Sequence, residues 1–231
     1  MSVGDAATGP RVLFVYYTYT QQSLKVVEAM GEVLAGRGCE VHQAPIEFTD
    51  SRYSQRFSSF PLLHLYRDLF GMIPAQARAA TGEIRLPEIA SDRAYDLVVI
   101  GSPTWWMRTS VPIRSFLKSD EARRILGNTR FAAFVVCRRY WSFNLNTVQK
   151  LGIERGGQYV DGIHWAFAGG QIKSLLSLLS YLGSGESRER YLGVRIPPTN
   201  LQAGDLEQAR EFARRLADRI VEPSSVGADQ S

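Results

Sequence analysis

Residues 95–106 read Tyr-Asp-Leu-Val-Val-Ile-Gly-Ser-Pro-Thr-Trp-Trp, and this stretch carries the clearest fold signal in the chain. The unbroken apolar run from Leu97 to Ile100 is typical of a strand that is buried on both faces. Gly101 and Pro103 mark a turn, so two tryptophans follow the carboxyl end of the predicted strand. We therefore expect a buried parallel strand that leads into an aromatic loop.

The rest of the chain alternates short apolar strands with amphipathic helices. We expect strands at residues 11–17, 40–46, 95–101, 131–137 and 159–167, and helices at about 22–36, 112–126, 139–152 and 205–221. Such alternation predicts parallel strands that are joined by right-handed crossovers. The predicted fold class is therefore α/β, with one doubly wound domain over residues 11–221 and helices on both faces of the sheet.

Two apolar segments exceed this plan, at about 49–90 and 168–203. We predict that both are insertions in the single domain, and that they form packed core, a homodimer face or a substrate wall. The two ends, residues 1–10 and 222–231, are small and polar without periodicity, so we predict disordered tails there.

Composition excludes several classes of protein. Of 231 residues, 45% are hydrophobic and 22% are charged, so a wholly disordered chain is excluded, and no apolar window of about 18 residues could span a membrane. The two cysteines lie far apart and the three histidines are isolated, so we expect neither a disulfide framework nor a metal site. We predict a cytoplasmic protein that binds neither membranes nor nucleic acid.

Positive charge is unevenly distributed along the chain. Residues 103–155 carry a net charge of +7, while the rest of the chain carries −3. About half of these cations are expected to be ordinary helix surface charges. Arg108, Arg138 and Arg139 lie in predicted ligand loops, where they would attract a phosphate-bearing nicotinamide or an acidic substrate.

Three loops follow neighbouring strands, where ligands bind in open α/β sheets. The first, Thr18 to Ser23, places hydroxyl groups at the start of a helix, which suits a phosphate group. It could equally be a simple helix cap. In the second loop, Trp105 and Trp106 offer flat faces to an aromatic ligand, although one of them is expected to close the core. The third loop, Arg138 to Trp141, is aromatic and doubly basic.

In this order, Thr-x-Thr-x-x-Ser at 18–23, Gly-x-Pro-Thr-Trp at 101–105 and the aromatic third loop resemble the flavodoxin-like superfamily. The resemblance extends to its larger FMN-dependent NAD(P)H oxidoreductases and quinone reductases. It covers about 11–167 and the last helix. It implies a three-layer flavodoxin-like sandwich, with a five-stranded parallel sheet in the order 2-1-3-4-5.

The resemblance also implies a site for FMN. The first loop would hold the phosphate group, and the other two loops would flank the isoalloxazine ring. The implied phosphate residues are Thr18, Thr20, Gln21, Gln22 and Ser23, and the implied ring residues are Ser102, Pro103, Thr104, Trp105, Trp106, Arg138, Arg139, Tyr140 and Trp141. Family members usually carry glycine at the position of Gln21, so we expect a loop that does without a glycine-only conformation.

The implied activity is hydride transfer from NAD(P)H through FMN to a quinone or another small acceptor. No side chain is assigned a catalytic role, because the cofactor carries the hydride. One alternative is a flavodoxin that transfers single electrons to a protein partner. The second is an accessory or condensing protein of lipid or polyketide biosynthesis. A weaker likeness of Phe60-Pro61 and 191–197 to flavodoxin-like dialkylresorcinol condensing enzymes motivates it.

Overall fold

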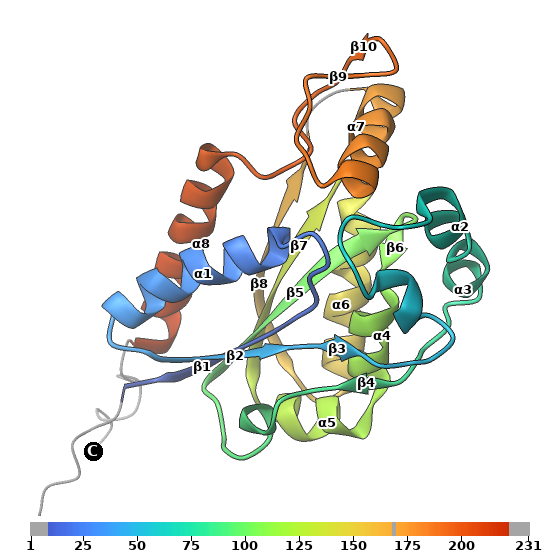
Figure 1. Ribbon diagram of the computed structural model, residues 1–231. Helices are drawn as coiled ribbons and strands as arrows, with labels where there is room; N and C mark the ends of the chain where they lie inside the picture. Colours follow the sequence, from blue (N-terminus) through green and yellow to red (C-terminus); the bar gives the residue numbers. More distant parts are fainter. Residues whose placement is uncertain (1–8, 168–169, 222–231) are drawn as a thin grey trace, which may run out of the picture.

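The structure is a computed structural model that describes residues 9–167 and 170–221 (Figure 1). Residues 1–8 and 222–231, on which the predicted tails fall, lie outside the described residues. Pro10 belongs to the first predicted tail but is described. Its carbonyl accepts a hydrogen bond from the Glu40 amide at 2.9 Å, which places the chain at the start of the sheet.

A parallel sheet forms the centre of the fold. Its order is β2-β1-β5-β7-β8, which confirms the predicted order 2-1-3-4-5. A sixth short strand, β6, pairs antiparallel with the end of β5 and was not predicted. The strands are β1 (Arg11–Tyr16), β2 (Glu40–Pro45), β5 (Leu97–Trp105), β6 (Arg108–Thr109), β7 (Arg130–Cys137) and β8 (Gln158–Ala166).

Helices cover both faces of the sheet, as Figure 1 shows. One face packs against α1 (Gln22–Gly36) and α8 (Ala203–Val221), and the other packs against α4 (Val111–Lys118), α5 (Asp120–Leu126) and α6 (Trp141–Glu154). Alternate side chains of β1 supply the two cores. Val12 and Phe14 enter the first core and Leu13 and Val15 the second, all without solvent exposure. The unbroken apolar run of this strand is thereby explained.

The single helix predicted at 112–126 is two helices. Ser119 separates α4 from α5 with an extended backbone, at φ −79° and ψ 162°. Its hydroxyl oxygen accepts a hydrogen bond from the Ala122 amide at 3.1 Å and so caps α5. The chain can leave the helix here because the Ser119 side chain accepts the hydrogen bond of the Ala122 amide, which a backbone carbonyl would accept in a continuous helix.

The two insertions contain short elements of their own. The first holds β3 (Glu47–Phe48), a 3-10 helix at Ser54–Phe57, α2 (Leu65–Phe70), α3 (Ile73–Ala77), β4 (Ile84–Arg85) and a 3-10 helix at Glu88–Ala90. The second holds α7 (Gln171–Ser184), β9 (Arg190–Tyr191) and β10 (Val194–Arg195). The insertions meet where the Leu62 amide donates to the Leu182 carbonyl at 2.8 Å. In the described part of the chain, no helix combines the length and apolar character needed to cross a membrane.

Candidate functional site

The three predicted ligand loops lie at one edge of the sheet. They follow β1, β5 and β7, which are neighbours, with Tyr16 beside Gly101 and Gly101 beside Phe134. Parallel neighbours end at the same edge, so the topology brings the three loops together. The predicted grouping of these loops therefore follows from the strand order.

The first loop leaves polar groups unsatisfied at the start of α1. The Thr18 side-chain oxygen is fully enclosed and has no hydrogen-bond partner among the described residues. No side chain caps α1, whose first amides therefore lack an intrahelical or side-chain acceptor. An enclosed hydroxyl beside free amides at a helix N-terminus is a suitable environment for an anion.

Gln21 adopts a left-handed backbone conformation, at φ 61° and ψ 6°. The expectation that this loop avoids a glycine-like conformation is therefore wrong. A residue other than glycine adopts the left-handed backbone conformation at a cost of about 1–2 kcal/mol. The Gln21 side chain is exposed, so it meets no steric obstacle that would prevent the turn.

The Gln22 side chain connects two segments of the chain through hydrogen bonds. Its Nε2 donates to the Thr20 carbonyl at 3.0 Å, and its Oε1 accepts from the Leu201 amide at 2.9 Å. Gln22 and Ser23 are both buried, at 5% and 2% exposure. Gln22 therefore joins the first loop to the segment before α8.

The residues Ser102, Pro103 and Thr104 continue β5 instead of forming a loop, because this strand runs four residues beyond its predicted end. Asn144 of α6, which is fully buried, organises them. The Ser102 hydroxyl donates to Asn144 Oδ1 at 2.9 Å, and Asn144 Nδ2 donates to Thr104 Oγ1, also at 2.9 Å. Sequence analysis missed Asn144, whose only signal is a polar residue on an apolar helix face.

Beyond Thr104 the chain reverses in a two-residue hairpin. Trp105 pairs with Arg108, and the intervening Trp106 and Met107 have φ values of 48° and 64°. Two positive φ values are typical of the tightest hairpin turns, which usually contain Asn-Gly. Two bulky residues here store conformational strain, a feature that concentrates at functional sites.

Both tryptophans pack against the core, whereas only one was expected to do so. The Trp105 ring stacks on Phe57 of the first insertion, with centroids 4.8 Å apart and planes 29° from parallel. Tyr17 meets Trp105 edge-on at 5.5 Å. Trp106 Nε1 donates to the Leu69 carbonyl at 3.1 Å, which fixes this ring against α2. The insertion thus occupies contacts that were expected for a ligand.

The third loop is partly held by its neighbours. Arg138 Nε donates to Ser174 Oγ of α7 at 3.1 Å, and burial lowers the pKa of this guanidinium. Trp141 stacks on His164, with centroids 3.6 Å apart, and burial lowers the pKa of that imidazole. Arg139 and Tyr140 are exposed, and Tyr140 precedes α6 as its N-cap with a φ of 61°. The loop therefore offers one engaged and one exposed arginine.

The basic excess of residues 103–155 is not gathered at this edge. Arg130 begins β7 and Arg155 is the C-cap of α6, three residues before β8, so both lie towards the amino ends of strands. Arg114 is 4% exposed and donates to the carbonyls of Ala80 and Thr109. Arg108, Arg138 and Arg139 are the cations that belong to the predicted ligand loops.

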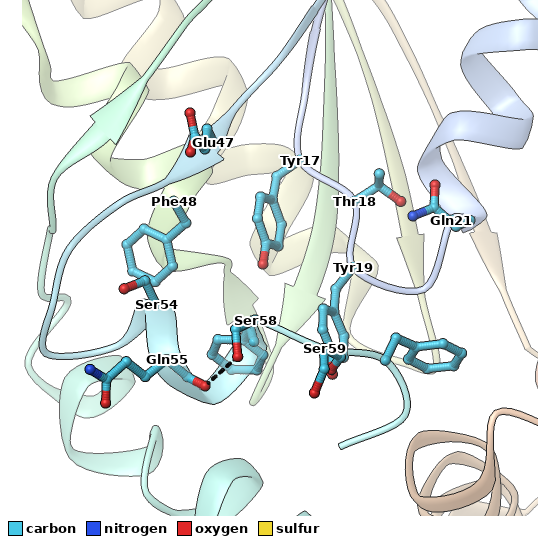
Figure 2. A pocket seen from close by; sticks show the side chains of 12 residues that line it. Tyr17, Thr18, Tyr19, Gln21, Glu47, Phe48, Ser54, Gln55, Ser58 and Ser59 are labelled. Carbon is cyan, nitrogen blue, oxygen red and sulfur yellow. Dashed lines mark hydrogen bonds between the residues drawn. The ribbon is translucent and has the colours of Figure 1, made fainter. Parts of the chain in front are cut away.

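A cavity of about 450 Å³ lies beside the first loop (Figure 2). Thr18 and Gln21 belong to its lining, and most of the remaining lining comes from residues 47–60 of the first insertion. No residue of the second or third loop lines it. The structure therefore brings the three loops to one edge but does not join them around one cavity. In the described residues, no cluster of histidine, cysteine or acidic side chains is arranged to hold a metal ion.

Comparisons with known proteins establish the fold. No protein-family model and no curated protein matches this sequence. A flavoprotein from Lactobacillus acidophilus NCFM, solved in complex with FMN, aligns with a TM-score of 0.50 and 17% identity, over 68% of this chain and 93% of that one. Oxidised flavodoxin 1 from Bacillus cereus also gives 0.50, with 11% identity over 90% of this chain and 97% of that one. The chain thus has a flavodoxin-like fold.

Proposed function

We propose that this protein binds FMN at the edge formed by the three loops, takes hydride from NAD(P)H and reduces a small quinone-like acceptor. The observation that supports the proposal most directly is the enclosed, partnerless Thr18 hydroxyl beside the uncapped start of α1. A phosphate group would satisfy both features at once. The fold shared with an FMN-bound flavoprotein is consistent with it.

The residues of the first loop fit the phosphate end of FMN. Thr18, Thr20 and Ser23 would offer hydroxyl groups, and Gln21 to Ser23 would offer backbone amides. The left-handed turn at Gln21 starts α1 without a side-chain cap, which leaves these amides available. The Gln22 side chain would hold the loop in place through Leu201.

The residues proposed to surround the flavin ring would fit it on one condition. Phe57 covers a face of Trp105, so a flavin ring can stack on Trp105 only if Phe57 moves. Tyr140 and Trp141, at 47% and 37% exposure, would cover the ring from the third loop. Arg138 is engaged with Ser174, so the exposed Arg139 would meet the nicotinamide phosphate. FMN would supply the hydride chemistry, while these residues would bind and orient the reactants.

A paired titration tests the phosphate site. We expect Thr18→Val, which keeps the shape and removes the hydroxyl, to weaken FMN binding roughly tenfold, as loss of a hydrogen bond to a charged group predicts. Riboflavin, which lacks the phosphate, should bind both forms equally. Thr147→Val on α6 is the matched control. If folded wild-type protein shows no flavin absorbance after FMN has been added and the free FMN removed, the proposal is wrong. Measurement of NADH and NADPH oxidation is then unnecessary.

The Phe57–Trp105 stack favours a second candidate function, namely a protein that has kept the scaffold without redox chemistry. A biosynthetic accessory or condensing role would fit this. Phe57→Ala separates the two candidates. Under the FMN proposal the variant should bind FMN more tightly than wild type does, because one face of Trp105 becomes free. Under the second candidate neither form should bind it.

A further inference from the structure

The cavity beside the first loop includes Thr18 and Gln21 of the proposed phosphate site, and it also has an aromatic wall. Five of its lining residues are aromatic, namely Tyr17, Tyr19, Phe48, Phe57 and Phe60. Three of them come from residues 47–60, the part of the chain that exceeds the basic fold. The volume of about 450 Å³ falls in the range of small-molecule sites.

Contacts among these rings hold the wall in place. Tyr19 meets Phe57 edge-on, with centroids 5.3 Å apart, and meets Phe60 in the same way at 5.6 Å. The Tyr19 hydroxyl also donates to the Ser59 carbonyl, which ties the insertion to the first loop. Such a preformed wall would cost a flat ligand little ordering entropy.

One buried hydroxyl points into this cavity. Tyr17 is 6% exposed, and Figure 2 shows its hydroxyl directed into the space between Phe48 and Tyr19. Burial, with a smaller contribution from Tyr19, raises the pKa of Tyr17 well above its ordinary value. The group therefore stays protonated and can donate a hydrogen bond to an oxygen atom of a ligand.

The charge of the lining selects against anions. Glu47 is the single charged residue among those that line the cavity, and it pairs with Arg85 at 3.5 Å. The basic side chains of the ligand loops, Arg108, Arg138 and Arg139, do not line the cavity. On the aromatic side of the cavity, opposite Thr18 and Gln21 (Figure 2), an anionic ligand would meet Glu47 and, among the described lining residues, no lysine or arginine.

From the aromatic wall, the inward hydroxyl and the absence of a lining cation, we propose that this cavity binds an uncharged aromatic compound of one or two rings. The ligand carries an oxygen atom that accepts a hydrogen bond from Tyr17. Its rings pack against Phe57 and Phe60. The cavity shares Thr18 and Gln21 with the proposed phosphate site, and Phe57 also covers Trp105, so binding is tested on the flavin-free protein.

Calorimetric titration of the flavin-free protein with 2-naphthol and with 2-naphthoate at pH 7 tests the inference. We expect 2-naphthol to bind at one site and the anionic 2-naphthoate to bind at least tenfold more weakly. Tyr17→Phe should weaken 2-naphthol binding roughly three- to tenfold, the effect of losing one hydrogen bond. Phe60→Ser should also weaken it, and Phe70→Ser, in the same insertion but outside the cavity, should not.

Several results would overturn the inference. These are no binding of 2-naphthol by folded wild-type protein, equal binding of 2-naphthoate, or normal binding by both Tyr17→Phe and Phe60→Ser. Displacement of 2-naphthol by riboflavin would show that the cavity belongs to the flavin ring, and would also overturn it. Because the titration needs no FMN, failure of the FMN proposal leaves this result interpretable.

Discussion

Gln21, Trp106, Met107 and Tyr140 all hold positive φ values, although none of them is glycine. All four lie in the three loops that follow β1, β5 and β7. The surrounding structure must compensate a cost of about 1–2 kcal/mol at each such residue. Among the described residues, the other non-glycine residues with positive φ lie elsewhere and are Ala79, Asn128 and Leu192. Four of the seven thus gather at this edge of the sheet, which is consistent with a functional site there.

Relief of this strain can be measured at Gln21. We expect Gln21→Gly to raise the free energy of unfolding by about 1 kcal/mol relative to Gln21→Ala, because only glycine enters the left-handed region freely. Urea denaturation of both variants provides the comparison. Equal stabilities would show that the loop is not strained at this residue.

A second prediction concerns Asn144, which bonds both Ser102 and Thr104 from a fully buried position. Asn144→Ala leaves these partners without their bonds, so we expect the free energy of unfolding to fall by about 2–4 kcal/mol. Asn146→Ala, at an exposed position of the same helix, is the matched control and should change it little. A loss below about 0.5 kcal/mol in Asn144→Ala would contradict the assigned network.

At the scale of elements, Asp50 anchors the first insertion. Its buried carboxylate accepts hydrogen bonds from the Arg52 side chain at 2.6 and 2.9 Å and from the Glu83 amide at 3.0 Å. The hydrogen bonds from Arg52, together with those from the Glu83 and Arg52 amides, hold its pKa well below the ordinary value. The two ends of the insertion are thereby joined through one charged group.

This anchor makes the stability of the protein depend on pH. A folded-state pKa below the unfolded one contributes stability above the unfolded-state pKa of about 4, and this contribution is lost as the pH falls towards the folded-state pKa. We expect Asp50→Asn to lower the free energy of unfolding by about 2 kcal/mol at pH 7, and the difference from wild type to shrink below about pH 4. Asp92→Asn, at an exposed aspartate, is the control in these pH-dependent urea melts and should change the free energy of unfolding little at pH 7.

For the whole molecule, each of the two insertions exposes a large apolar side chain. Leu63 is 82% exposed and Ile172 is 77% exposed, and Leu62 bonds Leu182 between the insertions. We propose that Leu63 and Ile172 belong to a homodimer interface. Light scattering after gel filtration would detect the dimer. The double variant Leu63→Glu/Ile172→Glu should be monomeric, while Ile153→Glu on α6 should stay dimeric. A monomeric wild type at high concentration would refute this.

The sequence by itself determined the strands and helices of the parallel sheet, and its resemblance to the flavodoxin-like superfamily implied the strand order. The apolar runs at 11–17 and 131–137 and the amphipathic face of α1 are local patterns, so their periodicity reveals strands, helices and crossovers without tertiary information. The three candidate loops follow from that order, because parallel neighbours end at one edge. The helix cap at Ser119 was not predicted, since the sequence pattern of residues 112–126 also fits an unbroken helix.

Only the tertiary structure decided which side chains from distant segments contact those loops. Asn144 reaches Ser102 across 42 residues of chain, and Phe57 of the first insertion lies on Trp105. The aromatic cavity joins Tyr17 to Phe60 in the same way. Contacts between distant segments leave no periodic signal, because each depends on where two independent elements are packed. Sequence therefore located the edge of the sheet at which the three loops gather, and packing determined which faces of that edge remain open.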